Sequence, residues 1–133
     1  MDVLFLLGRI LFAALFILSG VNHLTKVAAL SQYAASKKVP APRAAVVLSG
    51  LVILAGGLSI LLGYEPRIGA LLLVLFLVPT SFAMHNFWAV ADPMQRQVEM
   101  AMFLKNLALT GGALMTYYFV SAHPETWVYS LGH

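Results

Sequence analysis

The chain has 133 residues, of which 61% are apolar and only 10% are charged. About a quarter of the residues of an average globular domain are charged, so this composition excludes a soluble globular enzyme, a disordered protein and a nucleic-acid-binding domain. The net charge of +3 comes from a few loop residues and does not indicate a nucleic acid partner. The absence of cysteine excludes disulfides, thiolate-bound clusters and a thiol nucleophile. What remains is a multi-pass protein of the lipid bilayer.

Four stretches are long and apolar enough to cross the bilayer, because a spanning helix needs about 20 such residues. They are residues 3–22, 44–63, 68–91 and 100–122. None shows the alternation of period two that a membrane barrel requires. The first stretch has no positively charged leader and carries Arg9, so we expect a retained helix rather than a cleaved signal peptide.

The connections predict how these segments pack. Residues 23–43 are expected to form a short amphipathic helix at the membrane surface, ended by Pro40 and Pro42. Residues 64–67 are so few that the two helices they join must form an antiparallel hairpin. Asp92 and Pro93 predict the N-cap and first turn of the last helix. The predicted fold is a single all-α domain over residues 1–133, an up-down bundle of four transmembrane helices with a short interfacial helix after the first.

Loop charge predicts the orientation, because cytoplasmic loops are enriched in Lys and Arg. The loops after the first and third spans share one side of the membrane. They hold Lys26, Lys37, Lys38, Arg43 and Arg96, whereas the other side holds only Arg67. We therefore expect these two loops in the cytoplasm and both termini outside.

Four motifs follow one another along most of the chain. They are SGVNHL at 19–24, VPAP at 39–42, MHNFW at 84–88 and FLKNLALTGG at 103–112. In this order they resemble the DoxX-like family of small four-helix membrane proteins of bacteria and archaea. The resemblance implies a bacterial inner-membrane protein linked to respiratory redox chemistry. Named relatives are small subunits of thiosulfate:quinone oxidoreductase and terminal quinol oxidase.

Two ionisable side chains lie inside the predicted spans, where each is a candidate functional group. Arg9 is expected either to extend outward to headgroups or Asp2, or to face inward and pair with Glu65. Lys105 lies in a helical row with small residues, so we expect it to face the bundle interior rather than to snorkel into lipid.

Polar side chains from three helices converge at the cytoplasmic end of the predicted bundle, with an aromatic ring beside them. They are Asn22, His23, His85, Asn86, Trp88, Glu99, Lys105 and Asn106. Histidine, lysine and asparagine can donate hydrogen bonds to the carbonyls of a quinone, and a protonatable group can exchange its protons. The alternative is that these groups satisfy one another and hold the helices together.

Cofactor sites of other kinds have weaker support. His23 and His85 could ligate haem, but both lie at helix ends rather than in the middle of the bundle, so we expect no haem. No set of residues has the spacing of a metal site, and no nucleophile motif indicates catalysis. We predict a non-catalytic accessory subunit or anchor, without an intrinsic cofactor, in a quinone-linked redox complex. The alternatives are a small-molecule transport protein, oligomeric with copies of itself, and a purely structural assembly subunit.

Overall fold

All regular structure in the described part of the chain is helical, which confirms the all-α prediction. The computed structural model describes residues 2–127, apart from the side chain of Thr126. The helices are α1 (Asp2–Thr25), α2 (Val27–Ser36), α3 (Pro42–Leu62), α4 (Pro66–Met84), η1 (Phe87–Ala89), α5 (Pro93–Ala122) and η2 (Pro124–Thr126). The short helix predicted after the first span is α2.

Three helical stretches of the described chain are long and apolar enough to cross a membrane. They are α1, α3 and the segment Pro66–Ala89, which contains α4 and η1. Their outer faces are apolar, as on α1, where Leu4, Leu11 and Leu18 are strongly exposed at intervals of seven residues. Such a stripe suits contact with lipid. The 30 residues of α5 do not meet the same criterion, since they include Lys105, Asn106 and several other polar residues.

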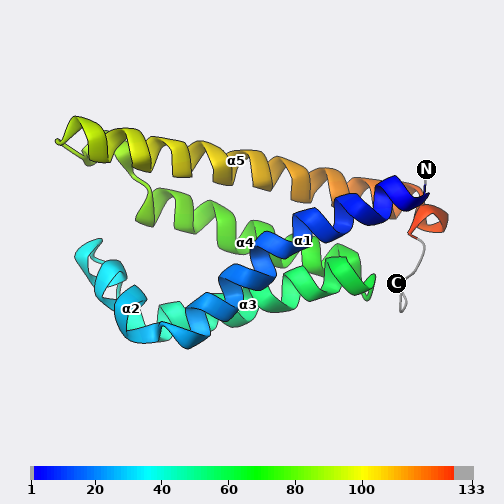
Figure 1. Cartoon of the computed structure of the whole chain (residues 1–133), viewed down its shortest axis with the longest axis horizontal. Helices are drawn as coiled ribbons and strands as arrows, with labels where there is room; N and C mark the ends of the chain where they lie inside the picture. The colour runs from blue at the N-terminus through cyan, green and yellow to red at the C-terminus, as the bar shows by residue number, and fades with distance from the viewer. Residues whose placement is uncertain (1, 128–133) are drawn as a thin grey trace.

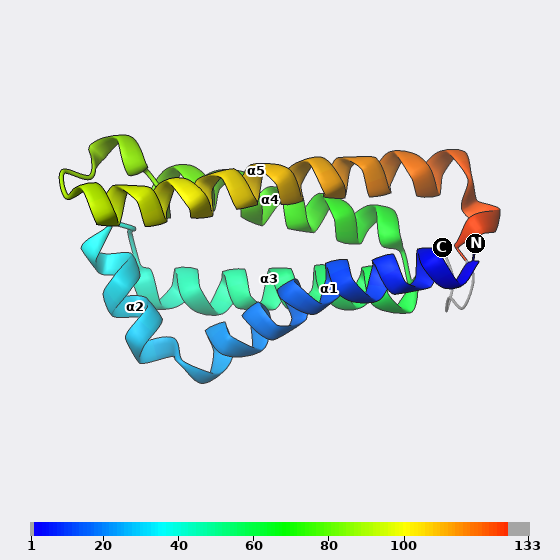
Figure 2. The same ribbon diagram turned by 45° about the horizontal axis from the view of Figure 1, so that its top comes forward.

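The long helices run up and down in chain order. α1 packs along α3, α3 packs against α4, and α4 packs against α5 (Figures 1 and 2). The short helix α2 contacts α3, and it lies at the same end of the molecule as the connection between α4 and α5 (Figure 2). Buried apolar side chains such as Phe16, Ile53 and Leu73 fill the space between the helices.

Glycines allow α1 and α3 to approach each other closely. A Cβ atom added to Gly20 would lie 2.9 Å from the Cβ of Leu54, and one added to Gly50 would lie 2.6 Å from the Cβ of His23. Both distances are too short for real side-chain contacts, so these positions need glycine. Because Gly50 has no side chain, the side chain of His23 can pack directly against α3.

The end of α4 departs from the sequence prediction. The third span was expected to be helical through residue 91, but α4 ends at Met84 and a short η1 follows. His85 still donates its backbone N–H to the carbonyl of Ser81 at 3.2 Å, but its φ of −121° leaves the helical region. The start of α5 is as predicted, because the carboxylate of Asp92 accepts from the N–H of Gln95 at 3.0 Å and caps the helix.

Candidate functional site

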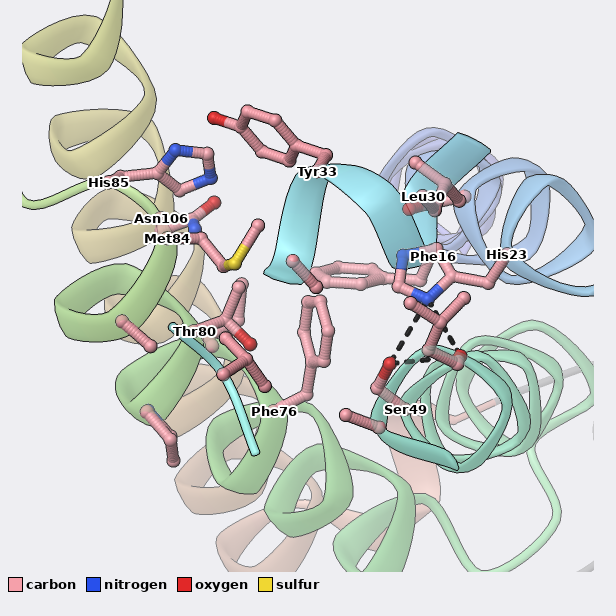
Figure 3. Close-up of a pocket in the computed structure, with 18 of the residues that line it drawn as sticks. Phe16, His23, Leu30, Tyr33, Ser49, Phe76, Thr80, Met84, His85 and Asn106 are labelled. Atoms are coloured by element: carbon pink, nitrogen blue, oxygen red, sulfur yellow. Dashed lines mark hydrogen bonds between the residues drawn. The ribbon is translucent and has the colours of Figure 1, made fainter. Parts of the chain in front are cut away.

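A cavity of about 370 Å³ lies between the helices, at the end of the molecule where α2 is found. Its walls are mostly apolar and include the rings of Phe16 and Phe76 (Figure 3). Polar side chains from five helices and the residue after α4 interrupt these walls. They are Ser19, His23, Tyr33, Ser49, Thr80, His85, Lys105 and Asn106. Four of the predicted site residues therefore line one cavity: His23, His85, Lys105 and Asn106.

Glu99 holds one side of this site together. Its carboxylate is buried and accepts a hydrogen bond from the hydroxyl of Tyr33 at 2.8 Å. The other carboxylate oxygen lies 2.8 Å from Nδ1 of His85 and 4.0 Å from Nζ of Lys37. The side-chain amide of Gln95 also donates to the carboxylate of Glu99, at 3.4 Å. Glu99 does not line the cavity itself but orients two residues that do.

The charge of this cluster follows from its hydrogen bonds. Glu99 lies in the second turn of α5, before the predicted span 100–122. Burial by itself raises the pKa of this carboxyl, but the hydrogen bonds from His85 and Tyr33 and the charge of Lys37 outweigh it, so the pKa lies below its ordinary value. Burial, with the adjacent carboxylate, raises the pKa of Tyr33 to about 12. At neutral pH the cluster contains a carboxylate and a protonated phenol.

The carboxylate also fixes the tautomer of His85. Because Glu99 is ionised and can only accept, Nδ1 of His85 carries a proton and donates it. In the neutral ring the other nitrogen, Nε2, is then an acceptor. Figure 3 shows this nitrogen directed toward the cavity.

His23 occupies the opposite wall. Its Nδ1 lies 3.2 Å from the carbonyl oxygen of Val46 and 3.1 Å from the hydroxyl oxygen of Ser49, both on α3. A carbonyl oxygen can only accept, which assigns the proton of the neutral ring to Nδ1. Its Nε2 also faces the cavity (Figure 3).

Asn106 contributes a buried amide to the same cavity. The residue is only 5% exposed, and its side-chain amide has no hydrogen-bond partner among the residues that the structure describes. Figure 3 shows the amide beside His85, at the cavity wall. A side-chain amide at the surface of a cavity carries both donors and an acceptor, so this group is suited to meet a polar atom of a bound molecule.

Lys105 corrects one prediction. It lines the cavity, but it is exposed, as are Ala101 and Ala108 of the same helical row. Lys105 thus lies beside His85 and Asn106, as predicted, but its side chain is exposed rather than buried between helices. The row was expected between helices, whereas α5 packs mainly on α4 and leaves this side uncovered in the described chain.

Besides Glu99, three predicted site residues lie outside the cavity lining. Asn86 accepts a hydrogen bond from Nζ of Lys37 at 3.4 Å and so fastens the end of α2 to the end of α4. Trp88 packs edge-on against Phe103, with ring centroids 5.5 Å apart, in an aromatic cluster. The backbone carbonyl of Asn22 accepts from the N–H of Lys26 at 2.9 Å, at the turn between α1 and α2.

Arg9 faces inward at the opposite end of the molecule. It is 3% exposed, and it donates to the carbonyl oxygens of Ile60 at 3.3 Å and Leu61 at 2.8 Å. Carbonyls in the last turn of a helix have no donor within the helix, so they are ready acceptors. The inward alternative is confirmed, but the acceptors are these carbonyls of α3 rather than the predicted carboxylate of Glu65.

Tyr33, Ser49 and Thr80 are site residues that the sequence did not single out. Tyr33 was recognised only as part of an amphipathic segment, and nothing in its spacing indicates contact with a residue 66 positions later. Ser49 and Thr80 are single hydroxyls in apolar helices, which commonly bond to their own backbone. Among the described residues no group of three or more His, Asp and Glu side chains could hold a metal ion.

These features define a helical membrane protein with an apolar cavity that polar groups enter from opposite walls. The family model described as DoxX matches residues 4–86. Over 114 residues the chain is 36% identical to inner membrane protein YqjF of Escherichia coli (strain K12), a match that covers 86% of this chain and 82% of that protein. The chain therefore belongs to the DoxX family, as its motifs indicated. No solved structure gives a significant match.

Proposed function

We propose that this chain is an inner-membrane subunit of a quinone-linked redox complex, and that its cavity holds the headgroup of a quinone. The observation that carries the proposal is that Asn106, His23 and His85 bring polar groups to one apolar cavity. The cavity volume of about 370 Å³ lies within the usual range of small-molecule sites. Such sites usually have apolar walls with a few polar groups, as this cavity does. The rings of Phe16 and Phe76 supply flat apolar surface for a ring ligand.

We also propose that α5 is the fourth spanning helix. Thirty residues extend about 45 Å, enough to cross a bilayer, and its exposed side chains include Leu104, Leu107, Leu114 and Met115. With four spans, both termini lie on one side, and the excess of basic residues in the loops of the other side supports a position of the termini outside the cytoplasm. The cavity is then near the cytoplasmic surface, within reach of protons from water.

The geometry supports a ligand site over the two alternatives. A continuous polar path along Arg9, Asn106 and Thr110 would favour transport, but the cavity lining includes only Asn106 of these. Arg9 is bonded to α3 at the far end. A purely structural role would leave the polar groups paired with one another, whereas the Asn106 amide has no partner among the described residues.

The test is purification of the chain from its native membrane under mild detergent, followed by identification of the bound polypeptides and extraction of bound lipophiles. We expect redox subunits and a quinone in amounts close to one per chain. An Asn106→Leu variant, which fills the same position with an apolar group, should lose the quinone and keep the partner chains. Retention of partners without any quinone in the unmodified protein would support the structural alternative. Partners without redox function would refute the proposal.

A further inference from the structure

The neutral cavity presents two hydrogen-bond acceptors from opposite walls. Nε2 of His85 is an acceptor because Glu99 binds the proton on Nδ1, and Nε2 of His23 is an acceptor because Val46 does the same. Both nitrogens face the cavity in Figure 3. Two fixed acceptors favour a ligand that carries hydrogen-bond donors over one that carries only acceptors.

We infer that the cavity selects the hydroxyl form of a ring lipophile, a hydroquinone, over the carbonyl form, because His23 and His85 both offer acceptors. A hydroquinone has two O–H donors on opposite sides of its ring, one for each histidine. A quinone has two carbonyl acceptors at the same places, which would face two nitrogen lone pairs. The inference rests on the proposed function and adds to it which redox state of the ligand is bound.

Asn106 does not change this preference. An amide offers both donors and an acceptor, so it can bond to a hydroxyl or to a carbonyl. Its role is to hold either form near His85. The selection comes from the histidines, and on the His85 side it depends on the carboxylate of Glu99.

The charged and titratable groups around His85 come from several elements. They are Glu99 and Lys105 on α5, Tyr33 on α2, Lys37 after α2, and His23 across the cavity on α1. Of these, Tyr33 keeps its proton until strongly alkaline pH. Imidazole is the kind of side-chain group that ordinarily gains a proton between about pH 8 and about pH 5. A second proton turns each Nε2 into a donor, so acid removes the preference for the hydroquinone.

The experiment measures binding of two probes, a decyl-substituted 1,4-benzoquinone and its hydroquinone, to the purified full chain under oxygen-free conditions. At pH 8 we expect the hydroquinone to bind at least about tenfold more tightly, the equivalent of one net hydrogen bond. The ratio of the two affinities should fall toward one as the pH is lowered to about 5. This pH series needs no variant.

The matched variant is Glu99→Gln. A glutamine can donate to Nδ1 as well as accept from it, so it no longer fixes the tautomer of His85, and the affinity ratio at pH 8 should fall about tenfold. The control is Glu125→Gln, which makes the same change in another carboxylate that lies beside a histidine. An oxygen of Glu125 lies 3.5 Å from Nδ1 of the exposed His123, and this pair is outside the cavity. It should leave the ratio unchanged.

The outcomes separate the two proposals. Binding of neither probe would refute the quinone site and the selection with it. Equal binding of both probes at pH 8, or tighter binding of the quinone, would refute the selection and leave the quinone site standing. If Glu99→Gln does not fold, the pH series decides alone, because a ratio that stays constant between pH 8 and pH 5 also refutes the selection.

Discussion

The hydroxyl of Tyr33 donates to the carboxylate of Glu99 at 2.8 Å, across 66 residues of sequence. This bond ties α2, which lines the cavity with Tyr33, to the first turns of α5, which carry the group that orients His85. Removal of the hydroxyl in Tyr33→Phe should therefore lower the free energy of unfolding by about 1 kcal/mol. The measurement is thermal unfolding in detergent. Tyr64→Phe, at a position 60% exposed, is the control and should change little.

The same tyrosine predicts a loss of stability at alkaline pH. Its pKa is raised from 10.0 to about 12 in the folded chain, so the folded state binds the phenolic proton more tightly than the unfolded state does. The resulting contribution to stability is complete below about pH 10 and is lost as the pH rises through about 12. Stability curves of the natural chain and of Tyr33→Phe should converge over this interval. Parallel curves would contradict the assignment.

The close contact of α1 with α3 depends on Gly50. In Gly50→Ala the new methyl group would meet the Cβ of His23, so His23 must move from its place beside Ser49. We expect a loss of about 1–3 kcal/mol, as for other overpacked sites. Gly111→Ala is the matched control, since nothing lies within 4 Å of its added Cβ. Thermal unfolding of both variants measures the difference in stability between them. Equal stability of the two would show that α1 and α3 can move apart at position 50 without a loss of stability.

Arg9 should contribute to stability through its bonds to α3. Arg9→Met keeps much of the side-chain length and removes the donors, which leaves the carbonyls of Ile60 and Leu61 without them. We expect a loss of about 2 kcal/mol or more, since hydrogen bonds from charged groups are stronger than neutral ones. Arg67→Met, on the exposed start of α4, is the control. A similar small effect of both changes would indicate that Arg9 does not fasten α1.

The orientation is open to a direct test. A reporter that is active only outside the cytoplasm, fused after residue 133, should be active, and one placed between Lys37 and Lys38 should be inactive. Reversal of the loop charges, with Lys37→Glu and Lys38→Glu, should weaken this preference. An active cytoplasmic reporter at the carboxyl terminus would refute either the fourth span or the loop-charge argument.

The long helices could be predicted from the sequence because their signal is local. Apolar runs, prolines after short connections and the Asp92 cap mark the helices within one or two turns, and the structure agrees with them except at the end of α4. There the sequence is apolar up to Val90 apart from His85 and Asn86, and the helix ends where the side chain of His85 bonds to Glu99 on α5. Such a contact between distant residues has no local pattern.

The site was only partly predictable for the same reason. Polar residues in apolar runs identified His23, His85, Lys105 and Asn106, and all four line the cavity. Which face of α5 is covered depends on how the helix pairs are placed, and the small residues near Lys105 did not predict that its side chain is exposed. The partners of Glu99 depend on where α2 lies. A helix of ten residues carries too little pattern to fix its position.

The bonds of Arg9 also set an order for the synthesis of this protein. The arginine enters the membrane with α1, but its acceptors, Ile60 and Leu61, come 51 and 52 residues later. At ordinary rates of translation these are made about 3 to 10 s afterwards. During that interval the guanidinium must be satisfied by water, headgroups or the insertion machinery. The first helix therefore completes these two hydrogen bonds of Arg9 only when α3 lies beside it.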